Sequence, residues 1–62
     1  MVANLKAIRK QRGMTQGELA TLVGINRITI IKYESGKVDP TIESATKLAN
    51  VLGVTVDELI SA

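Results

Sequence analysis

Two helix-forming stretches separated by only a few residues constrain the fold of this chain most strongly. The first begins at residues 15–18, whose T-x-x-E pattern is that of a capping box. It runs to Gly24, a residue type that readily takes the left-handed conformation ending a helix. Asn26 then supplies a new N-cap, and Arg27–Glu34 form the next helix. Helices joined this closely cross at a steep angle, so we expect a helix-turn-helix over residues 16–35.

The remaining chain predicts three more helices and no strand. One helix should run from residue 2 or 3 to Arg12, and another, capped by Thr41, should run to Leu52. A short last helix should begin after Thr55 and end near Ile60. Apolar residues at helical spacing in the fourth helix, which we expect to face inward, are Ile42, Ala45, Leu48, Ala49 and Leu52. Residues 1–62 are therefore expected to form a single compact all-α domain of five helices.

The composition excludes several classes of site. The chain of 62 residues has no Cys and no His, which excludes disulfides and the usual zinc sites, and we expect no cofactor. No nucleophile–base pair or phosphate-cradling glycine loop is present, so we expect no enzyme. Tyr33 is the sole aromatic residue, which argues against base stacking on aromatic platforms. The N-terminal sequence alternates apolar and charged residues and no apolar run would span a membrane, so we expect a cytoplasmic protein.

Charge is distributed unevenly along the chain. Residues 1–37 carry seven basic and two acidic side chains, a net charge of +5, whereas residues 38–62 carry one basic and four acidic side chains, a net charge of −3. The basic half contains the predicted helix-turn-helix. This distribution is the one expected for a domain that binds phosphates, although a solvated surface with chance clustering is the alternative.

Several stretches together resemble the phage Cro/repressor-type, or lambda-repressor-like, helix-turn-helix family. The stretches are LKAIRKQRGMTQGELA, then LVGI, then YESGKVDPTIESATKLANVLGVTVDELI, so the resemblance extends from Leu5 to Ile60. It fixes many positions at once: Gln16, Ala20, Gly24, Ile30, Glu34, Gly36, Pro40 and the LGVTVDEL ending. The resemblance implies a transcription regulator that places the second helix of the motif in the DNA major groove.

The resemblance also implies roles for individual residues. The positions that match base-reading residues of the family are Gln16, Arg27, Ile28, Thr29 and Lys32. Arg27 is the strongest candidate, because arginine binds guanine O6 and N7 bidentately. Lys32 could read a base or bind a phosphate. We expect phosphate contacts from Lys10, Ser35 and Lys37.

Arg9 and Glu34 match residues that often form an ion pair between the first and third helices of the family. The alternative for Arg9 is a phosphate contact. We favour the pair, because an unpaired Glu34 at the end of a DNA-facing helix would repel phosphate.

Three aliphatic residues stand where polar residues are usual. Ile28 and Ile31 could contact thymine methyl groups in the groove, or they could belong to a protein-binding surface with Leu22. A purely structural position is the third interpretation of Ile31. We also expect the protein to act as a homodimer through the C-terminal region. The expected interface consists of Val54, Leu59 and Ile60, and we expect Leu59 and Ile60 to be exposed.

The function predicted from the sequence is therefore sequence-specific binding of double-stranded DNA by a homodimeric regulator. We favour a repressor, although an activator would use the same DNA contacts. The first alternative is the antitoxin of a toxin–antitoxin pair, in which Leu22, Ile31 and Ile60 would bind a protein toxin. The second alternative is a structural domain that binds no DNA. The chain leaves no room for an effector pocket, so we expect no small-molecule ligand.

Overall fold

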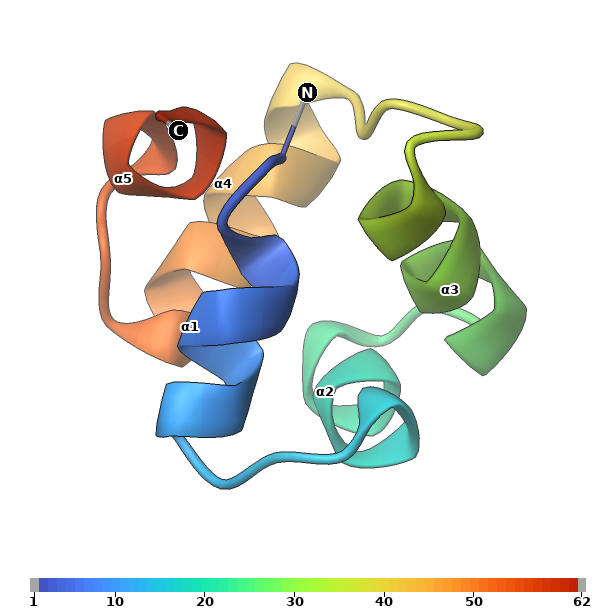
Figure 1. Ribbon diagram of the computed structural model, residues 1–62. Helices are drawn as coiled ribbons and strands as arrows, with labels where there is room; N and C mark the ends of the chain where they lie inside the picture. The colour runs from blue at the N-terminus through green and yellow to red at the C-terminus, as the bar shows by residue number, and fades with distance from the viewer. Residues whose placement is uncertain (1, 62) are drawn as a thin grey trace.

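The computed structural model describes residues 2–61 and contains five α-helices (Figure 1). In chain order these are α1 (Leu5–Gln11), α2 (Gln16–Val23), α3 (Arg27–Ser35), α4 (Ile42–Leu52) and α5 (Val56–Ile60). No strand occurs within residues 2–61, and the helices pack into a body of 23 × 23 × 19 Å. The predicted all-α, five-helix architecture is therefore confirmed. No helix in this part of the chain has the length and apolar content needed to cross a lipid bilayer.

Polar N-cap side chains begin four of the five helices where the sequence predicts them. At the start of α2, the Thr15 hydroxyl accepts a hydrogen bond from the backbone N–H of Glu18 at 3.1 Å. The Glu18 carboxylate in turn accepts one from the Thr15 backbone N–H at 2.9 Å, which completes the capping box. The four N-cap residues are Thr15, Asn26, Thr41 and Thr55.

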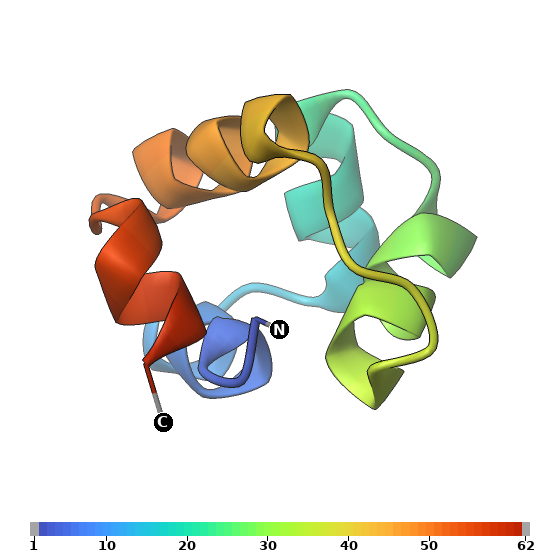
Figure 2. The ribbon, with the colours of Figure 1, turned by 90° about the horizontal axis from the view of Figure 1, so that it is seen from above.

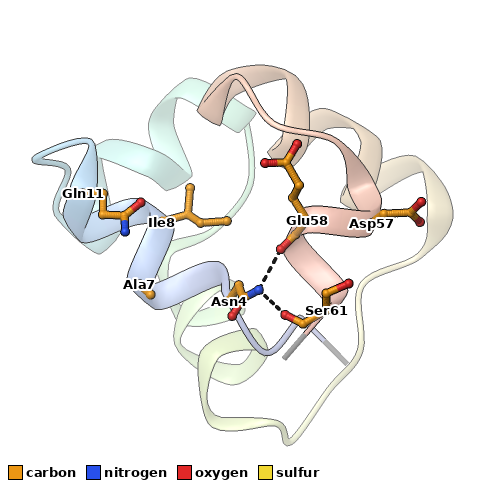
Figure 3. Close-up of a pocket in the computed structure, with 7 residues that line it drawn as sticks. All are labelled: Asn4, Ala7, Ile8, Gln11, Asp57, Glu58 and Ser61. Atoms are coloured by element: carbon orange, nitrogen blue, oxygen red, sulfur yellow. Dashed lines mark hydrogen bonds between the residues drawn. The ribbon is translucent and has the colours of Figure 1, made fainter.

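The first helix begins later than the sequence predicts, at Leu5 instead of residue 2 or 3. Asn4 occupies the N-cap position but makes no side-chain cap. Its amide nitrogen instead donates to the backbone carbonyls of Glu58 and Ser61, so the beginning of α1 is bound to α5 (Figure 3). The expected early start was wrong. Asn4 is held outside the helix by these bonds and by a hydrogen bond from its backbone N–H to the Leu59 carbonyl at 3.0 Å.

The core gathers apolar side chains from all five helices. Its most deeply buried members each have at most 2% of their surface exposed, and they are Leu5, Leu19, Ile30, Leu48, Leu52 and Leu59. Removing one such side chain from water contributes roughly 1.5–3 kcal/mol to folding. A core drawn from all five helices explains how so short a chain closes into one body.

Two apolar residues lie where the sequence analysis did not expect them. Ile42, predicted to face inward, is 88% exposed because it is the first residue of α4 and precedes the helix turn that reaches the core. Leu59, predicted to be exposed at a dimer interface, is fully buried. The short helix α5 packs on α1 and α4, and Leu59 is its contribution to the core. The neighbouring Ile60 is 42% exposed, and Val54 is half-buried.

The helices are arranged so that α3 lies at one side of the molecule and α5 at the other, as two views at right angles show (Figures 1 and 2). Helix α2 packs against both α3 and α4 and so fixes α3 to the rest of the domain. Helix α3 is therefore held from behind while one of its faces is directed to solvent.

Candidate nucleic-acid interface

The turn between α2 and α3 occupies residues 24–26. Gly24 has φ of 81° and ψ of 32°, a left-handed conformation that other residue types adopt at a cost. The backbone N–H groups of Gly24 and Ile25 both donate to the carbonyl of Ala20, at 2.8 and 3.0 Å. Asn26 then caps α3 by accepting from the backbone N–H of Ile28 at 2.8 Å. These bonds define the crossing of the two helices, which was the feature predicted from residues 16–35.

Helix α3 has a buried side and a solvent-facing side. Ile30 and Tyr33 face the core, and Tyr33 is only 8% exposed. The exposed residues define a surface that we call the α3 outer face, and they are Arg27, Ile28, Lys32 and Ser35. Thr29 and Ile31 are half-buried at the margins of this surface. The structure thus brings most of the proposed base-reading residues to one surface and leaves Thr29 partly covered.

The two cations of the α3 outer face have no protein partner among residues 2–61. Neither the Arg27 guanidinium nor the Lys32 ammonium group takes part in an ion pair or a side-chain hydrogen bond there. The stem of Arg27 lies beside Gly17 of α2, where an added Cβ would be 3.8 Å from Arg27 Cδ. Both charges are therefore available to a ligand that approaches α3.

A buried ion pair lies behind this surface. Arg9 Nε donates to Glu34 Oε2 at 2.7 Å, and Arg9 Nη2 donates to Glu34 Oε1 at 3.1 Å. The two side chains are only 8% and 5% exposed. Arg9 Nη1 also donates to the Met14 carbonyl at 2.8 Å, so the guanidinium joins α1 to α3 and to the loop before α2. The geometry matches the expected ion pair. The Arg9 side chain points inward, so it is not placed to bind a phosphate.

Gln16 completes the cluster behind α3. Its Nε2 donates to Glu34 Oε1 at 3.0 Å, and its side chain is half-buried at the first position of α2. Burial alone would raise the pKa of Glu34, but the hydrogen bonds from Arg9 and Gln16 and the positive charges of Arg9 and Lys6 outweigh it. The net effect lowers the pKa of Glu34, so the carboxylate is ionised at neutral pH.

The proposed phosphate-binding residues lie around the ends of these helices. Lys10 near the end of α1 and Lys37 just after α3 are both exposed. Ser35 is also exposed, but its hydroxyl donates to the Lys32 carbonyl at 3.1 Å and must release this bond to donate to a phosphate. Arg12, just after α1, is exposed, and its Nε donates to the Leu52 carbonyl at the end of α4 at 2.9 Å.

Two features of this region were missed by the sequence analysis. One is the hydrogen bond between Gln16 and Glu34, which were expected to have separate roles. The two residues lie 18 positions apart, and no local sequence pattern indicates this contact. The second is a groove of about 110 Å³ at the start of α4 and the end of α5, in which only Ile60 was expected to belong to an interface. The residues that line it are Val2, Pro40, Thr41, Ile42, Ala45, Val56 and Ile60.

Comparison with known proteins identifies the family. A helix-turn-helix family model matches residues 5–59. The SPbeta prophage-derived HTH-type transcriptional regulator YonR of Bacillus subtilis is 43% identical over 56 residues, which cover 90% of this chain and 52% of that protein. An HTH-type transcriptional regulator of Archaeoglobus fulgidus is 39% identical over 59 residues, covering 95% of this chain and 84% of its own length.

A phage repressor is also similar to the chain. The cryptic phage CTXphi transcriptional repressor RstR of Vibrio cholerae is 34% identical over 59 residues, covering 95% of this chain and 53% of that protein. The chain thus spans about half the length of the two phage-derived relatives and most of the archaeal one. The fold, the family match and these relatives agree, and the chain belongs to the Cro- and repressor-type helix-turn-helix family of non-enzymatic, DNA-binding transcription regulators.

Proposed function

We propose that this chain binds specific double-stranded DNA sequences as a homodimer and represses transcription in the cytoplasm. The observation that carries the proposal is the α3 outer face, on which Arg27 and Lys32 are exposed and have no partner among residues 2–61. The helix is held from behind by α2, so it can enter a major groove as a rigid unit. Repression is favoured because blocking a promoter requires only that the protein occupies its site.

The base-reading roles follow from the chemistry of each exposed residue. Arg27, in the first turn of α3, would bind guanine O6 and N7. Ile28 is 58% exposed and would contact a thymine methyl group. Lys32, one turn further along, would reach a base or a phosphate. Thr29 and Gln16 are half-buried and would contribute from the edges of the interface.

Phosphate contacts would set the orientation of the domain on the duplex. Lys10 and Lys37 are exposed at the ends of α1 and α3, and Ser35 lies on the α3 outer face. Contacts of this kind position a protein without reading sequence. They would supply the salt-dependent part of the affinity.

A homodimer is supported by the small size of the recognition surface. One helix reads only a few base pairs, whereas two helices about 34 Å apart on one face of DNA read a site long enough to be specific. Because Leu59 is buried, we replace the expected interface with the apolar groove between the start of α4 and the end of α5. Ile42, at 88% exposure, and Ile60 are the residues that a second copy of this chain would cover.

Selection from a pool of random DNA duplexes tests this proposal. We expect the wild-type protein to enrich a sequence with two half-sites related by a dyad and spaced by about one helical turn. The spacing follows from the two-fold symmetry of a dimer. A pool that remains random after repeated selection would contradict specific DNA binding, and a single asymmetric site would contradict the dimer.

The antitoxin alternative is supported by the exposed aliphatic surface of α2. Leu22 is 59% exposed and lines a shallow depression with Thr15, Gly17, Glu18 and Thr21. An antitoxin would use this surface to bind a toxin while α3 binds DNA. Co-purification with the product of an adjacent reading frame, lost in Leu22→Lys but retained in Asn50→Lys, an exposed change on α4 outside this depression, would support this second function. Wild-type protein that purifies without that product would count against it.

A further inference from the structure

The cluster behind α3 contains one hydrogen bond that a simple ion pair does not need. Glu34 accepts two hydrogen bonds from Arg9, which already joins α1 to α3. Glu34 Oε1 also accepts from Nε2 of Gln16, at 3.0 Å. Gln16 is the first residue of α2 and one of the residues expected to touch DNA. A buried carboxylate thus connects the internal ion pair to the DNA-facing surface.

Glu34 is well suited to hold another side chain in place. Its side chain is 5% exposed and is bound by a guanidinium that is itself fixed by the Met14 carbonyl. The lowered pKa of Glu34 keeps it charged, and hydrogen bonds to charged groups are stronger than neutral ones. The Gln16 amide therefore bonds to an acceptor that cannot easily move or lose its charge.

The remaining groups of the Gln16 amide determine what it can recognise. An amide has two N–H donors and one carbonyl acceptor. One N–H is bound to Glu34, and no donor among residues 2–61 reaches Gln16 Oε1. One N–H and the carbonyl oxygen are thus left. With the N–H that points away from the carbonyl bound to Glu34, the remaining two groups lie side by side and form the pair that binds adenine N7 and N6 in the major groove.

We propose that Glu34 is a positioning residue for DNA recognition, which fixes the Gln16 amide in the orientation that reads adenine. The inference rests on the proposed function, since Gln16 must face DNA. Fixing the amide before binding removes part of the entropy cost of ordering a glutamine side chain in the complex. It also prevents the amide from rotating to present its carbonyl toward Glu34.

Two double variants separate positioning from the structural role of the ion pair. Arg9→Met with Glu34→Met replaces the pair by apolar side chains, a change that folded proteins often tolerate. Arg9→Met with Glu34→Gln removes the same charges but keeps an acceptor, the side-chain carbonyl of the introduced amide, within reach of Gln16. Both variants lose the bond to Met14 and have the same net charge, so they differ only in the group offered to Gln16.

NMR of the free protein tests the positioning itself. In the wild type we expect the side-chain NH₂ group of Gln16 to be ordered on the ps–ns timescale, with one of its protons slow to exchange with water. The variant with Glu34→Gln should keep this order, and the variant with Glu34→Met should lose it. A Gln16 amide that is mobile in the wild type, or equally ordered in both double variants, would overturn the inference.

Binding to the duplex enriched by the wild-type protein tests the consequence for recognition. Gln16→Ala should weaken binding about tenfold in the wild type and in the variant with Glu34→Gln, but about twofold or less in the variant with Glu34→Met. Glu43→Gln, a change at an exposed residue of α4, is the control and should leave the effect of Gln16→Ala unchanged. If Glu34 only stabilised the fold, Gln16→Ala would weaken DNA binding by the same factor in both double variants.

The outcomes distinguish this inference from the proposed function. If a duplex is enriched and the factor is the same in both double variants, the inference fails while the proposed function stands. If no duplex is enriched, the proposed function fails and the role in recognition fails with it, even where NMR shows an ordered Gln16 amide.

Discussion

At the scale of single residues, the pair between Arg9 and Glu34 joins α3, which carries the candidate interface, to α1. Its two side chains are more than nine-tenths buried, and Arg9 also satisfies the Met14 carbonyl. A buried pair of this kind adds little net stability compared with apolar residues, but removing one partner leaves an uncompensated charge. The fold is therefore expected to tolerate replacement of both residues together better than replacement of either one alone.

A double-mutant cycle measures this dependence. We expect Arg9→Met and Glu34→Gln each to destabilise the fold, Arg9→Met by about 3–5 kcal/mol because the Glu34 carboxylate is left buried and unpaired. The coupling energy from urea unfolding should exceed about 0.5 kcal/mol, the limit for independent sites. The exposed pair of Glu43 and Lys47, separated by 3.6 Å, is the control and should couple by at most about 0.5 kcal/mol. Additive effects of the two changes at Arg9 and Glu34 would contradict the role of the pair.

Acid should weaken the fold through the same carboxylate. The pKa of Glu34 in the folded state lies below its ordinary value, so its contribution to stability is fully present above the unfolded pKa of about 4.3. The contribution is lost as the pH falls through the folded pKa. Urea unfolding from pH 7 to pH 2 should show a larger loss in the wild type than in Arg9→Met with Glu34→Met. Equal losses in the two proteins would place the acid sensitivity elsewhere.

At the scale of helices, the helix-turn-helix requires glycine at its turn and tolerates another residue at the glycine inside α2. Gly24 has positive φ, and an added Cβ there would meet no atom within 4 Å, so a side chain would cost backbone strain and cause no clash. Gly17 lies inside α2, and an added Cβ would contact Arg27 Cδ at an ordinary 3.8 Å. Glycine is needed at the turn, whereas α2 would be more stable with another residue at position 17.

Alanine substitution at these two glycines tests the distinction. Gly24→Ala should reduce the free energy of unfolding by about 1–2 kcal/mol, the cost of left-handed backbone in an L-residue. Gly17→Ala should raise it by about 0.5 kcal/mol, because glycine disfavours helix and the effect is smaller near a helix start. Urea denaturation of both variants checks the signs. Destabilisation by Gly17→Ala would show that the start of α2 is more crowded than its contacts indicate.

Local signals in the sequence predicted the elements well, and tertiary contacts account for the differences. The bounds of α2 follow from the capping box at Thr15 and the stop at Gly24. Helix α1 begins late because the backbone and side chain of Asn4 bond to carbonyls of residues 58–61, a contact between opposite ends of the chain that no local pattern contains.

For the candidate site, the sequence predicted the exposed residues of α3 but not which residues of α5 are exposed. Arg27, Ile28 and Lys32 were expected at the surface because they match base-reading positions of the family, and all three are exposed. The exposure of Leu59 was predicted wrongly, because in a helix as short as α5 the apolar periodicity does not determine which of two adjacent residues faces the core.

At the scale of the whole molecule, charge and apolar surface are consistent with separate tasks for the two halves of the chain. The basic half contains α2 and α3, and the acidic half contains α4 and α5 with the groove beside Ile42 and Ile60. A dimer formed through this groove would involve little area, so the second half-site on DNA would strengthen the association.

Charged substitution in the groove tests the dimer. Ile42→Asp with Ile60→Asp should leave the fold intact, because both residues are exposed, but should abolish cooperative filling of the two half-sites. Gel-shift titrations on the enriched duplex and on a single half-site measure the cooperativity. The matched control is Lys47→Asp, an exposed change on α4 outside the groove. Unchanged cooperativity in the double variant would place the interface elsewhere, with Leu22 as the next candidate.

The effect of Arg27→Ala on specificity tests the proposal that α3 reads DNA sequence. The measurement is the ratio of affinities for the enriched duplex and a random duplex, taken over a range of salt concentrations for Arg27→Ala and for the control Lys47→Ala. We expect Arg27→Ala to lose discrimination worth about 1–3 kcal/mol while keeping weak, salt-sensitive binding, because phosphate contacts remain. Lys47→Ala should leave the ratio unchanged. An unchanged ratio in Arg27→Ala would contradict the proposed reading of DNA by the α3 outer face.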